Sequence, residues 1–218
     1  MFDVEIFRQA VPVLASAAVV TVKLTAAAAA VSLVVGTLSA VLQVGGGRPG
    51  YWISRAYVSL MRGTPLFVQL LVVFFGLPLL GLHSQAFLAA AIAIGLNSGA
   101  YVTEILRAAI LAVPRGQVEA AMAVGLSRAT VWRRIVLPQA AITSIPMLTA
   151  ELTIVLKSTP LASVISVTEM TYAGVLIQAR AFSAIEVFVP IAIGYILLAQ
   201  VIARMARYLE RRLQPLRG

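Results

Sequence analysis

The chain has 218 residues, of which 61% are hydrophobic and 11% are charged, and its mean hydropathy is +0.97. A water-soluble domain carries roughly 45–50% apolar and about 25% charged residues, so this composition excludes a soluble or a disordered protein and leaves no room for a large water-facing enzyme domain. The chain has no cysteine, and its net charge of +9 is arranged in a pattern that indicates membrane orientation rather than nucleic-acid binding.

Long apolar stretches predict five transmembrane helices, because crossing the hydrocarbon core takes about 20 apolar residues. In chain order these spans lie at about 22–43, 58–80, 85–108, 135–157 and 186–209. We interpret 158–180, which is apolar but rich in Ser, Thr and Gly, as a re-entrant or surface element, with a sixth span as the alternative. The sequence therefore predicts an all-α integral membrane protein in which residues 1–218 form a single transmembrane domain.

The basic residues predict how these spans are oriented, because cytoplasmic loops carry an excess of Lys and Arg. Four basic residues, Arg8, Lys23, Lys157 and Arg180, lie on one side, and Lys23 is expected at the outer end of the first span. The other 13 of the 17 follow the first, third and fifth spans: Arg48, Arg55, Arg62, Arg107, Arg115, Arg128, Arg133, Arg134, Arg204, Arg207, Arg211, Arg212 and Arg217. The rule places the N-terminus outside and the C-terminus in the cytoplasm, as an odd number of spans requires.

The loop at about 113–134, between the third and fourth spans, contains signals for a short helix of its own. Pro114 ends the third span, and residues 117–124 are good helix formers. Gly125 suits the position after a helix where φ is positive, and Ser127 can cap the next helix. The sequence therefore predicts one short helix that projects from the cytoplasmic face.

This short helix has a narrow face, because Ala120 and Ala121 carry small side chains. Glu119, near its N-terminus, is favoured by the helix dipole and could pair with an arginine of a partner. From the residues alone, two interpretations stay open. The segment is either an ordinary loop between two spans or a helix that enters a groove of another protein. Pro138, at the start of the fourth span, leaves a carbonyl unpaired and is expected to bend that helix.

Five segments, in this order along the chain, carry a resemblance to one family. They are Arg62-Gly63-Thr64-Pro65-Leu66, Ala100-Tyr101-Val102-Thr103-Glu104, Gly116-Gln117-Val118-Glu119-Ala120-Ala121 followed by Gly125, Leu137-Pro138-Gln139-Ala140, and Lys157-Ser158-Thr159-Pro160-Leu161. They resemble motifs of bacterial ABC importer permeases of the polar amino acid (histidine, glutamine and arginine) uptake type, including the EAA loop. Ser158, Pro160 and Ala150 depart from the usual residues of that family.

The resemblance implies a type I ABC importer permease fold, with a cytoplasmic coupling helix, in the bacterial inner membrane. It implies two ATP-binding subunits, a second permease copy or a sister permease, and an extracytoplasmic binding protein that delivers an amino acid. ATP and magnesium would be bound by the partner ATPase, because this chain has no Gly-x-x-x-x-Gly-Lys-Ser/Thr loop and is expected to be no enzyme and to hold no cofactor. The residues expected to contact the ATPase are Glu119, Ala120, Ala121, Gly125 and Leu126.

Polar residues within the spans are candidates for the substrate path, because an ionised group at bilayer depth normally faces protein or water. Glu151 is the clearest, and either attracts a substrate amine or forms a structural pair. Lys157 lies about 120° further around the same helix, which argues against a pair between these two. Glu104 is expected to pair with Arg107. The remaining path candidates are Asn97, Tyr101, Thr64 and Gln69.

No metal cluster or nucleophile–base arrangement is visible in the sequence, and His83 is the only histidine. The alternative to an ATP-driven importer is an ATP-independent secondary transporter of small polar solutes, which predicts internal repeats and uptake by this chain alone. The sequence leaves open which amino acid is carried and whether the permease pair is homodimeric or heterodimeric.

Overall fold

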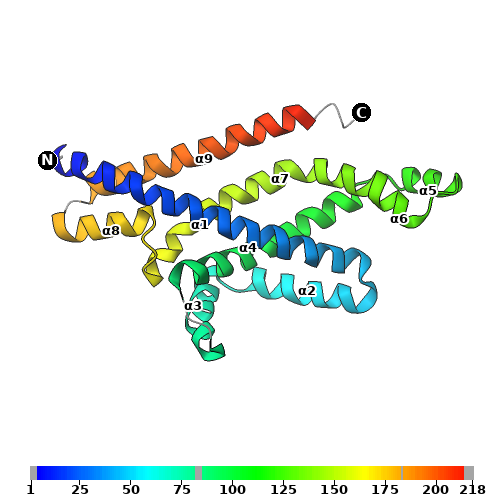
Figure 1. Ribbon diagram of the computed structural model, residues 1–218, viewed down its shortest axis with the longest axis horizontal. Coiled ribbons are helices and arrows are strands. Elements are labelled where there is room, and N and C mark those ends of the chain that lie inside the picture. Colours follow the sequence, from blue (N-terminus) through cyan, green and yellow to red (C-terminus); the bar gives the residue numbers. More distant parts are fainter. Residues whose placement is uncertain (1–3, 82–84, 183, 214–218) are drawn as a thin grey trace.

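The computed structural model describes residues 4–81, 85–182 and 184–213, and all regular elements in these ranges are helical (Figure 1). Four long helices run along the long axis of the molecule: α1 (Val4–Gly45), α4 (Ala86–Leu111), α7 (Leu137–Ser158) and α9 (Ile185–Leu213). The shorter elements are α2 (Gly47–Gly63), α3 (Leu66–Gly76), η1 (Leu77–Leu80), α5 (Arg115–Ala123), α6 (Arg128–Val131), the π-helical turn η2 (Trp132–Val136), η3 (Thr159–Ile165) and α8 (Met170–Ala181).

The prediction of an all-helical chain with long apolar spans is confirmed. In the described part of the chain, four helical runs are long and apolar enough to cross a membrane, and a fifth candidate is the bent pair α2–α3. The third and fifth expected spans correspond closely to α4 and α9. The fourth is longer than expected, because one helical run continues from Arg128 through α6, η2, α7 and η3 to Ile165.

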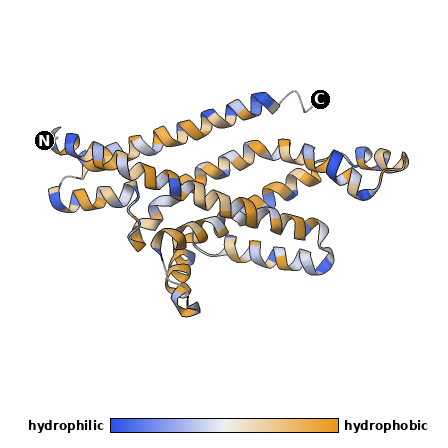
Figure 2. Cartoon of the chain, in the orientation of Figure 1, coloured by the Kyte–Doolittle hydropathy of each residue, from blue (hydrophilic) through white to orange (hydrophobic). Residues whose placement is uncertain are grey.

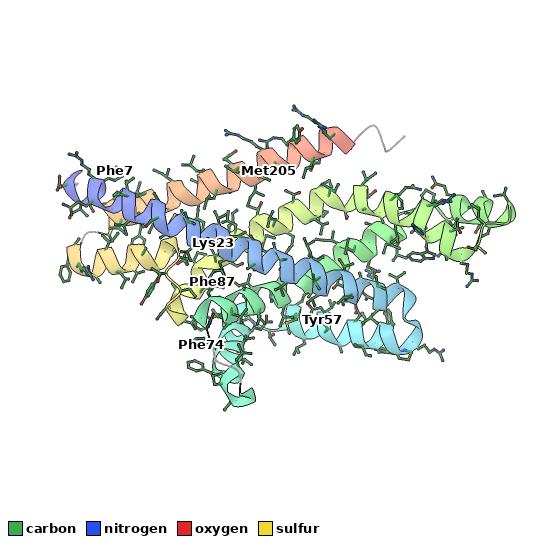
Figure 3. All side chains as sticks on the ribbon, viewed as in Figure 1. Phe7, Lys23, Tyr57, Phe74, Phe87 and Met205 are labelled. Carbon is green, nitrogen blue, oxygen red and sulfur yellow. The ribbon has the colours of Figure 1, made fainter. Side chains whose placement is uncertain are left out.

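The first expected span, 22–43, lies within a longer helix, because α1 begins at Val4. Its 42 residues extend about 63 Å, twice the thickness of a hydrocarbon core. A single lysine does not end a helix, and residues 10–20 are apolar, so the helix continues through both. Lys23 therefore lies midway along α1 rather than at its end (Figure 3), with an exposed side chain.

The second expected span, 58–80, is not one continuous helix. Helix α2 ends at Gly63, α3 begins at Leu66, and the two axes differ by 108°. The sequence explains this break, because Pro65 lacks an N–H and favours an extended conformation in the residue before it. Thr64 has that conformation, with φ −123° and ψ 148°.

Within the described residues, the segment 158–180 contains no separate helix long enough to be a sixth span. It contains η3 and then α8, which has 12 residues and is too short to cross a bilayer. Glu169 caps α8, because its carboxylate accepts hydrogen bonds from the backbone N–H groups of Thr171 and Tyr172 at 2.9 and 2.7 Å. The same carboxylate accepts a 2.8 Å hydrogen bond from the Tyr195 hydroxyl of α9, which holds α8 against that helix.

Helices α1 and α4 pack backbone against backbone, because glycines occupy their interface. A Cβ atom on Gly95 would lie 2.5 Å from the Cβ of Val31 and 2.8 Å from the Ala28 carbonyl oxygen. A Cβ atom on Gly36 would lie 2.5 Å from Cγ1 of Val102. Small residues allow such close approach in membrane proteins, where packing rather than hydrophobic burial drives helix association.

Apolar side chains of the described residues form three buried clusters along the molecule. The largest joins α1, α3, α4, α7 and η3, a second joins the first half of α1 to α8 and α9, and a small third one lies in the α5–α6 loop. Figure 2 shows hydrophobic residues along the length of the long helices and hydrophilic residues at the ends of the molecule. The loop containing α5 and α6 lies at one of these ends, opposite the N-terminus and α8 (Figure 1).

Candidate functional site

A cavity of about 260 Å³ lies between α1, α4 and α7, with Leu209 of α9 at its wall. Most of its lining is apolar, and its polar side chains are Ser32, Ser98, Thr149 and Glu151. Among the described residues that line it, Glu151 alone is charged. An apolar cavity with a few convergent polar groups is the usual form of a small-molecule site.

Glu151 is buried, with 6% of its surface exposed, and accepts a 2.7 Å hydrogen bond from the Ser98 hydroxyl of α4. This bond connects α7 to α4 at the cavity. Lys157 lies on the same run of helix, but its side chain is exposed and the structure records no ion pair between it and Glu151. The cavity therefore presents one carboxylate whose recorded partner, within the described residues, is a neutral hydroxyl.

Three other path candidates, Thr64, Gln69 and Asn97, come together at the corner between α2 and α3. The Gln69 amide nitrogen donates to the Met61 carbonyl at 2.9 Å and to the Thr64 hydroxyl at 2.6 Å. The Asn97 amide nitrogen of α4 donates to the same Met61 carbonyl at 2.9 Å and to the Gln69 side-chain oxygen at 3.0 Å. Carbonyls at a helix break need such partners in a membrane, where no water replaces them.

Tyr101 belongs to a separate group, in which the guanidinium carbon of Arg62 lies 5.1 Å from its ring centroid. About one helical turn further along α4, Glu104 accepts a 2.8 Å hydrogen bond from Arg107, so the predicted pair of these two residues is confirmed. Arg55 of α2 lies 4.0 Å from the other oxygen of Glu104. The six path candidates therefore divide into the Glu151 cavity, the α2–α3 corner, the Arg62–Tyr101 contact and the exposed Lys157.

The loop between α4 and α7 has the local structure that its sequence favours. Helix α5 ends in a Schellman motif, in which the N–H of Leu126 donates to the Ala121 carbonyl at 3.2 Å and the N–H of Gly125 donates to the Met122 carbonyl at 3.0 Å. Gly125 has φ +86°, which glycine adopts without strain. The Ser127 hydroxyl then caps α6 by accepting from the Thr130 N–H.

The residues expected to contact an ATPase do not all lie on the outside of this loop. Glu119, Ala120, Gly125 and Leu126 are exposed, whereas Ala121 is 7% exposed and packs against Val131 and Val136. The exposed face also carries two apolar side chains that the sequence reasoning did not select, Met122 and Val124, with 43% and 77% of their surface exposed.

Two further contacts were not anticipated from the sequence. Ser98, the partner of Glu151, lies next to Asn97 but about 100° around the helix, and nothing in the pattern of α4 distinguishes the two faces. Gln139 of α7 donates a 2.7 Å hydrogen bond to Gln117 of α5. Gln117 lies in the segment 116–121 and Gln139 in the segment 137–140, but neither motif indicates that the two side chains form a hydrogen bond.

Comparisons with known proteins agree with this architecture. Residues 32–215 match the family described as binding-protein-dependent transport system inner membrane component. The chain is 35% identical over 217 residues to the glutamine transport system permease protein GlnP of Escherichia coli, covering 99% of each chain. It is 33% identical over 205 residues to the arginine transport system permease protein ArtQ of Bacillus subtilis, covering 94% of each.

Two solved structures have the same fold. The crystal structure of an amino acid ABC transporter with histidines contains a chain that matches with a TM-score of 0.90 at 33% identity, covering 98% of this chain and 100% of that one. A chain of the MetNI methionine ABC transporter in an inward facing conformation matches with a TM-score of 0.76, covering 92% of this chain and 96% of that one. Its 19% identity makes this second match a likeness of fold alone.

Proposed function

This chain belongs to the family of binding-protein-dependent transport system inner membrane components, and from that premise we propose that it carries a polar amino acid past Glu151 into the cytoplasm. It is the permease subunit of an ATP-binding-cassette importer and resides in the inner membrane. The comparisons favour this function over an ATP-independent secondary transporter.

The chemistry of the cavity supports an amino acid as substrate. Every α-amino acid carries an ammonium group, and Glu151 supplies a negative charge in surroundings that are otherwise neutral. The relatives are described as transporters of glutamine, arginine and cystine, which share the amino acid backbone and differ in side-chain charge. Glu151 would therefore recognise the ammonium group that these compounds have in common.

The ends of the molecule support the proposed orientation, with the N-terminus outside and the C-terminus in the cytoplasm. The loop with α5 and α6 carries Arg115, Arg128, Arg133 and Arg134, and the last turns of α9 carry Arg211 and Arg212. Arginine-rich loops remain on the cytoplasmic side during insertion. Helix α5 would then project towards the cytoplasm, where ATP is available.

In the proposed complex, two such permeases, identical or sister chains, bind two ATP-binding subunits, and an extracytoplasmic binding protein delivers the amino acid. The ATPase subunits would hold ATP and magnesium. Helix α5 would be the coupling helix, and Glu119, Ala120, Gly125 and Leu126, together with Met122 and Val124, would contact the ATPase. Ala121 would hold α5 against the rest of the loop rather than contact the ATPase, because it packs against Val131 and Val136.

The observation that carries this proposal is the continuity between the exposed loop and the cavity. The loop that presents α5 leads into the helical run Arg128–Ile165, which carries Glu151 at the cavity wall. A force applied to the loop would thus reach the cavity through one run of helix.

The test is uptake of radiolabelled L-glutamine and L-arginine into proteoliposomes that contain the permease pair, its ATPase and its binding protein. We expect uptake of at least one of them that requires ATP on the cytoplasmic side and stops when the ATPase is omitted. Uptake by the permease alone would contradict the proposal and support a secondary transporter. Uptake of neither compound would contradict the assignment of a polar amino acid as substrate.

A further inference from the structure

The structure joins α5 directly to α7 through two glutamines that lie 22 residues apart in the sequence. The side-chain nitrogen of Gln139 donates a 2.7 Å hydrogen bond to the side-chain oxygen of Gln117. Gln117 lies in the first turn of α5, and Gln139 lies in the first turn of α7. The bond therefore connects the loop helix to the helix that carries Glu151.

Apart from this bond, α5 contacts α6 and η2 through a small apolar cluster that contains Ala121, Val131 and Val136. A groove of about 670 Å³ lies beside the two elements, lined by Ala120 of α5, by Val124 just after it, and by residues of η2 and α7, including Ile135 and Pro138. Both glutamines line this groove, so their bond crosses it. Contacts between alanine and other apolar groups are not directional, whereas a hydrogen bond fixes the relative position of the two helices.

The chain beyond Gln139 is suited to carry a displacement onward. Pro138 has no N–H, and the Leu137 N–H donates to the Trp132 carbonyl five residues earlier, which produces the π-helical turn η2. Helix α7 then continues, with Pro146 inside it, to Glu151, 12 residues and about 18 Å beyond Gln139. Gln139 therefore lies just after the π-helical turn, in the first turn of the helix that lines the cavity.

We propose that Gln117 and Gln139 are positioning residues that transmit movement of α5 to α7 and so couple ATP hydrolysis to transport. This rests on the proposed function, because it assumes that an ATPase moves α5. When α5 shifts, the hydrogen bond carries the first turn of α7 with it. Without the bond, only non-directional apolar contacts connect α5 to the start of the α7 run, and ATP is hydrolysed with fewer molecules carried.

The test measures ATP hydrolysed per amino acid imported by the full complex in proteoliposomes, with whichever of L-glutamine and L-arginine the wild type carries faster. We expect Gln117→Met and Gln139→Met each to raise this ratio about two- to tenfold, the range that one net hydrogen bond supports. Gln117→Glu keeps the acceptor oxygen and should keep the wild-type ratio. Gln9→Met is the matched control, because Gln9 also forms an exposed side-chain hydrogen bond, at 2.9 Å, but lies at the far end of the molecule.

The double variant Gln117→Met/Gln139→Met separates coupling from general damage. If both residues act through one bond, the double variant should hydrolyse as much ATP per imported amino acid as either single variant. If the two substitutions act independently, the increases in this ratio should multiply. An unchanged ratio in both single variants, or multiplied effects in the double variant, would overturn the positioning role. Failure of the wild-type complex to import either amino acid would count instead against the proposed function, so the two failures are distinguishable.

Discussion

Ser98 donates a 2.7 Å hydrogen bond to Glu151, and this contact between α4 and α7 places a carboxylate against an apolar cavity. The hydroxyl supplies one donor to the carboxylate but no charge. A cationic group that enters the cavity would therefore meet a carboxylate with no recorded ion pair in the described part of the chain. This relationship makes Glu151 the first residue to test.

Glu151→Gln should lower uptake about 10- to 100-fold at low substrate concentration, because a hydrogen bond to a charged group contributes about 1.5–3 kcal/mol. Glutamine is similar in shape and keeps an oxygen for Ser98, so the fold should be retained. The measurement is the initial uptake rate against concentration of L-glutamine and L-arginine. Glu5→Gln, on the exposed first turn of α1, is the control carboxylate. Unchanged uptake of both amino acids by Glu151→Gln would remove this residue from the substrate path.

Gln69→Leu or Asn97→Leu should destabilise the protein by about 1–3 kcal/mol, because each removes donors from carbonyls at the corner between α2 and α3. The measurement is the thermal unfolding midpoint of the purified protein in detergent. Gln200→Leu is the control, because Gln200 lies on an exposed face of α9 and should tolerate an apolar side chain. A midpoint that falls no further than that of the control would show that the corner does not depend on these amides.

The positions of most spans could be predicted from the sequence, because apolar length is a local property. The break at Thr64 and Pro65 was not anticipated, although Pro65 carries the signal, since an apolar run by itself indicates only one span. The full length of α1 was not predictable for a different reason. Lys23 suggests the end of an apolar span, but an exposed lysine is compatible with an uninterrupted helix.

The candidate site was predictable only as a set of residue types. Glu151 was selected because an ionised residue is rare at membrane depth, and the structure places it at the cavity. Asn97, Gln69 and Thr64 were grouped with it because they are also polar, yet they bond to one another and to backbone carbonyls at the α2–α3 corner. Which polar residue meets which depends on contacts between helices distant in sequence, and a single sequence does not contain that information.

Gly95→Val should destabilise the protein by about 1–3 kcal/mol, or more, because its side chain would overlap Val31 and the Ala28 carbonyl at the contact between α1 and α4. Gly116→Ala is the control, since a Cβ atom there meets nothing within 4 Å. The measurement is the amount of folded protein recovered from membranes together with its unfolding midpoint. Equal stability of the two variants would contradict the close approach of α1 and α4.

Gly125→Val should abolish most coupled uptake while the protein still inserts, because a β-branched residue is strained at φ +86° and would distort the end of α5. Gly125→Asn should be tolerated better, since asparagine adopts this conformation more readily. Uptake and membrane content are measured in parallel. Wild-type uptake by Gly125→Val would show that the loop does not need this geometry.

Glu119→Lys should impair coupled uptake at least severalfold without changing membrane content, because it reverses the charge on the exposed face of α5. The same assay measures it, with ATP hydrolysis followed in parallel. Arg115→Lys, which keeps the charge at the start of the same helix, is the control. Full coupled uptake by Glu119→Lys would exclude this residue from the ATPase contact.

Helix α1 contributes side chains to two separate apolar clusters. Ala10, Leu14 and Ala17 belong to the cluster with α8 and α9, and Leu24 and Ala28 belong to the cluster with α4. Progressive N-terminal truncation should therefore act in stages. Removal of the first 20 residues would remove the α1 side chains that pack against α8 and the start of α9. The close contact between α1 and α4 at Gly36 and Gly95 would remain. The two clusters therefore depend on different parts of the same helix and can be disrupted separately.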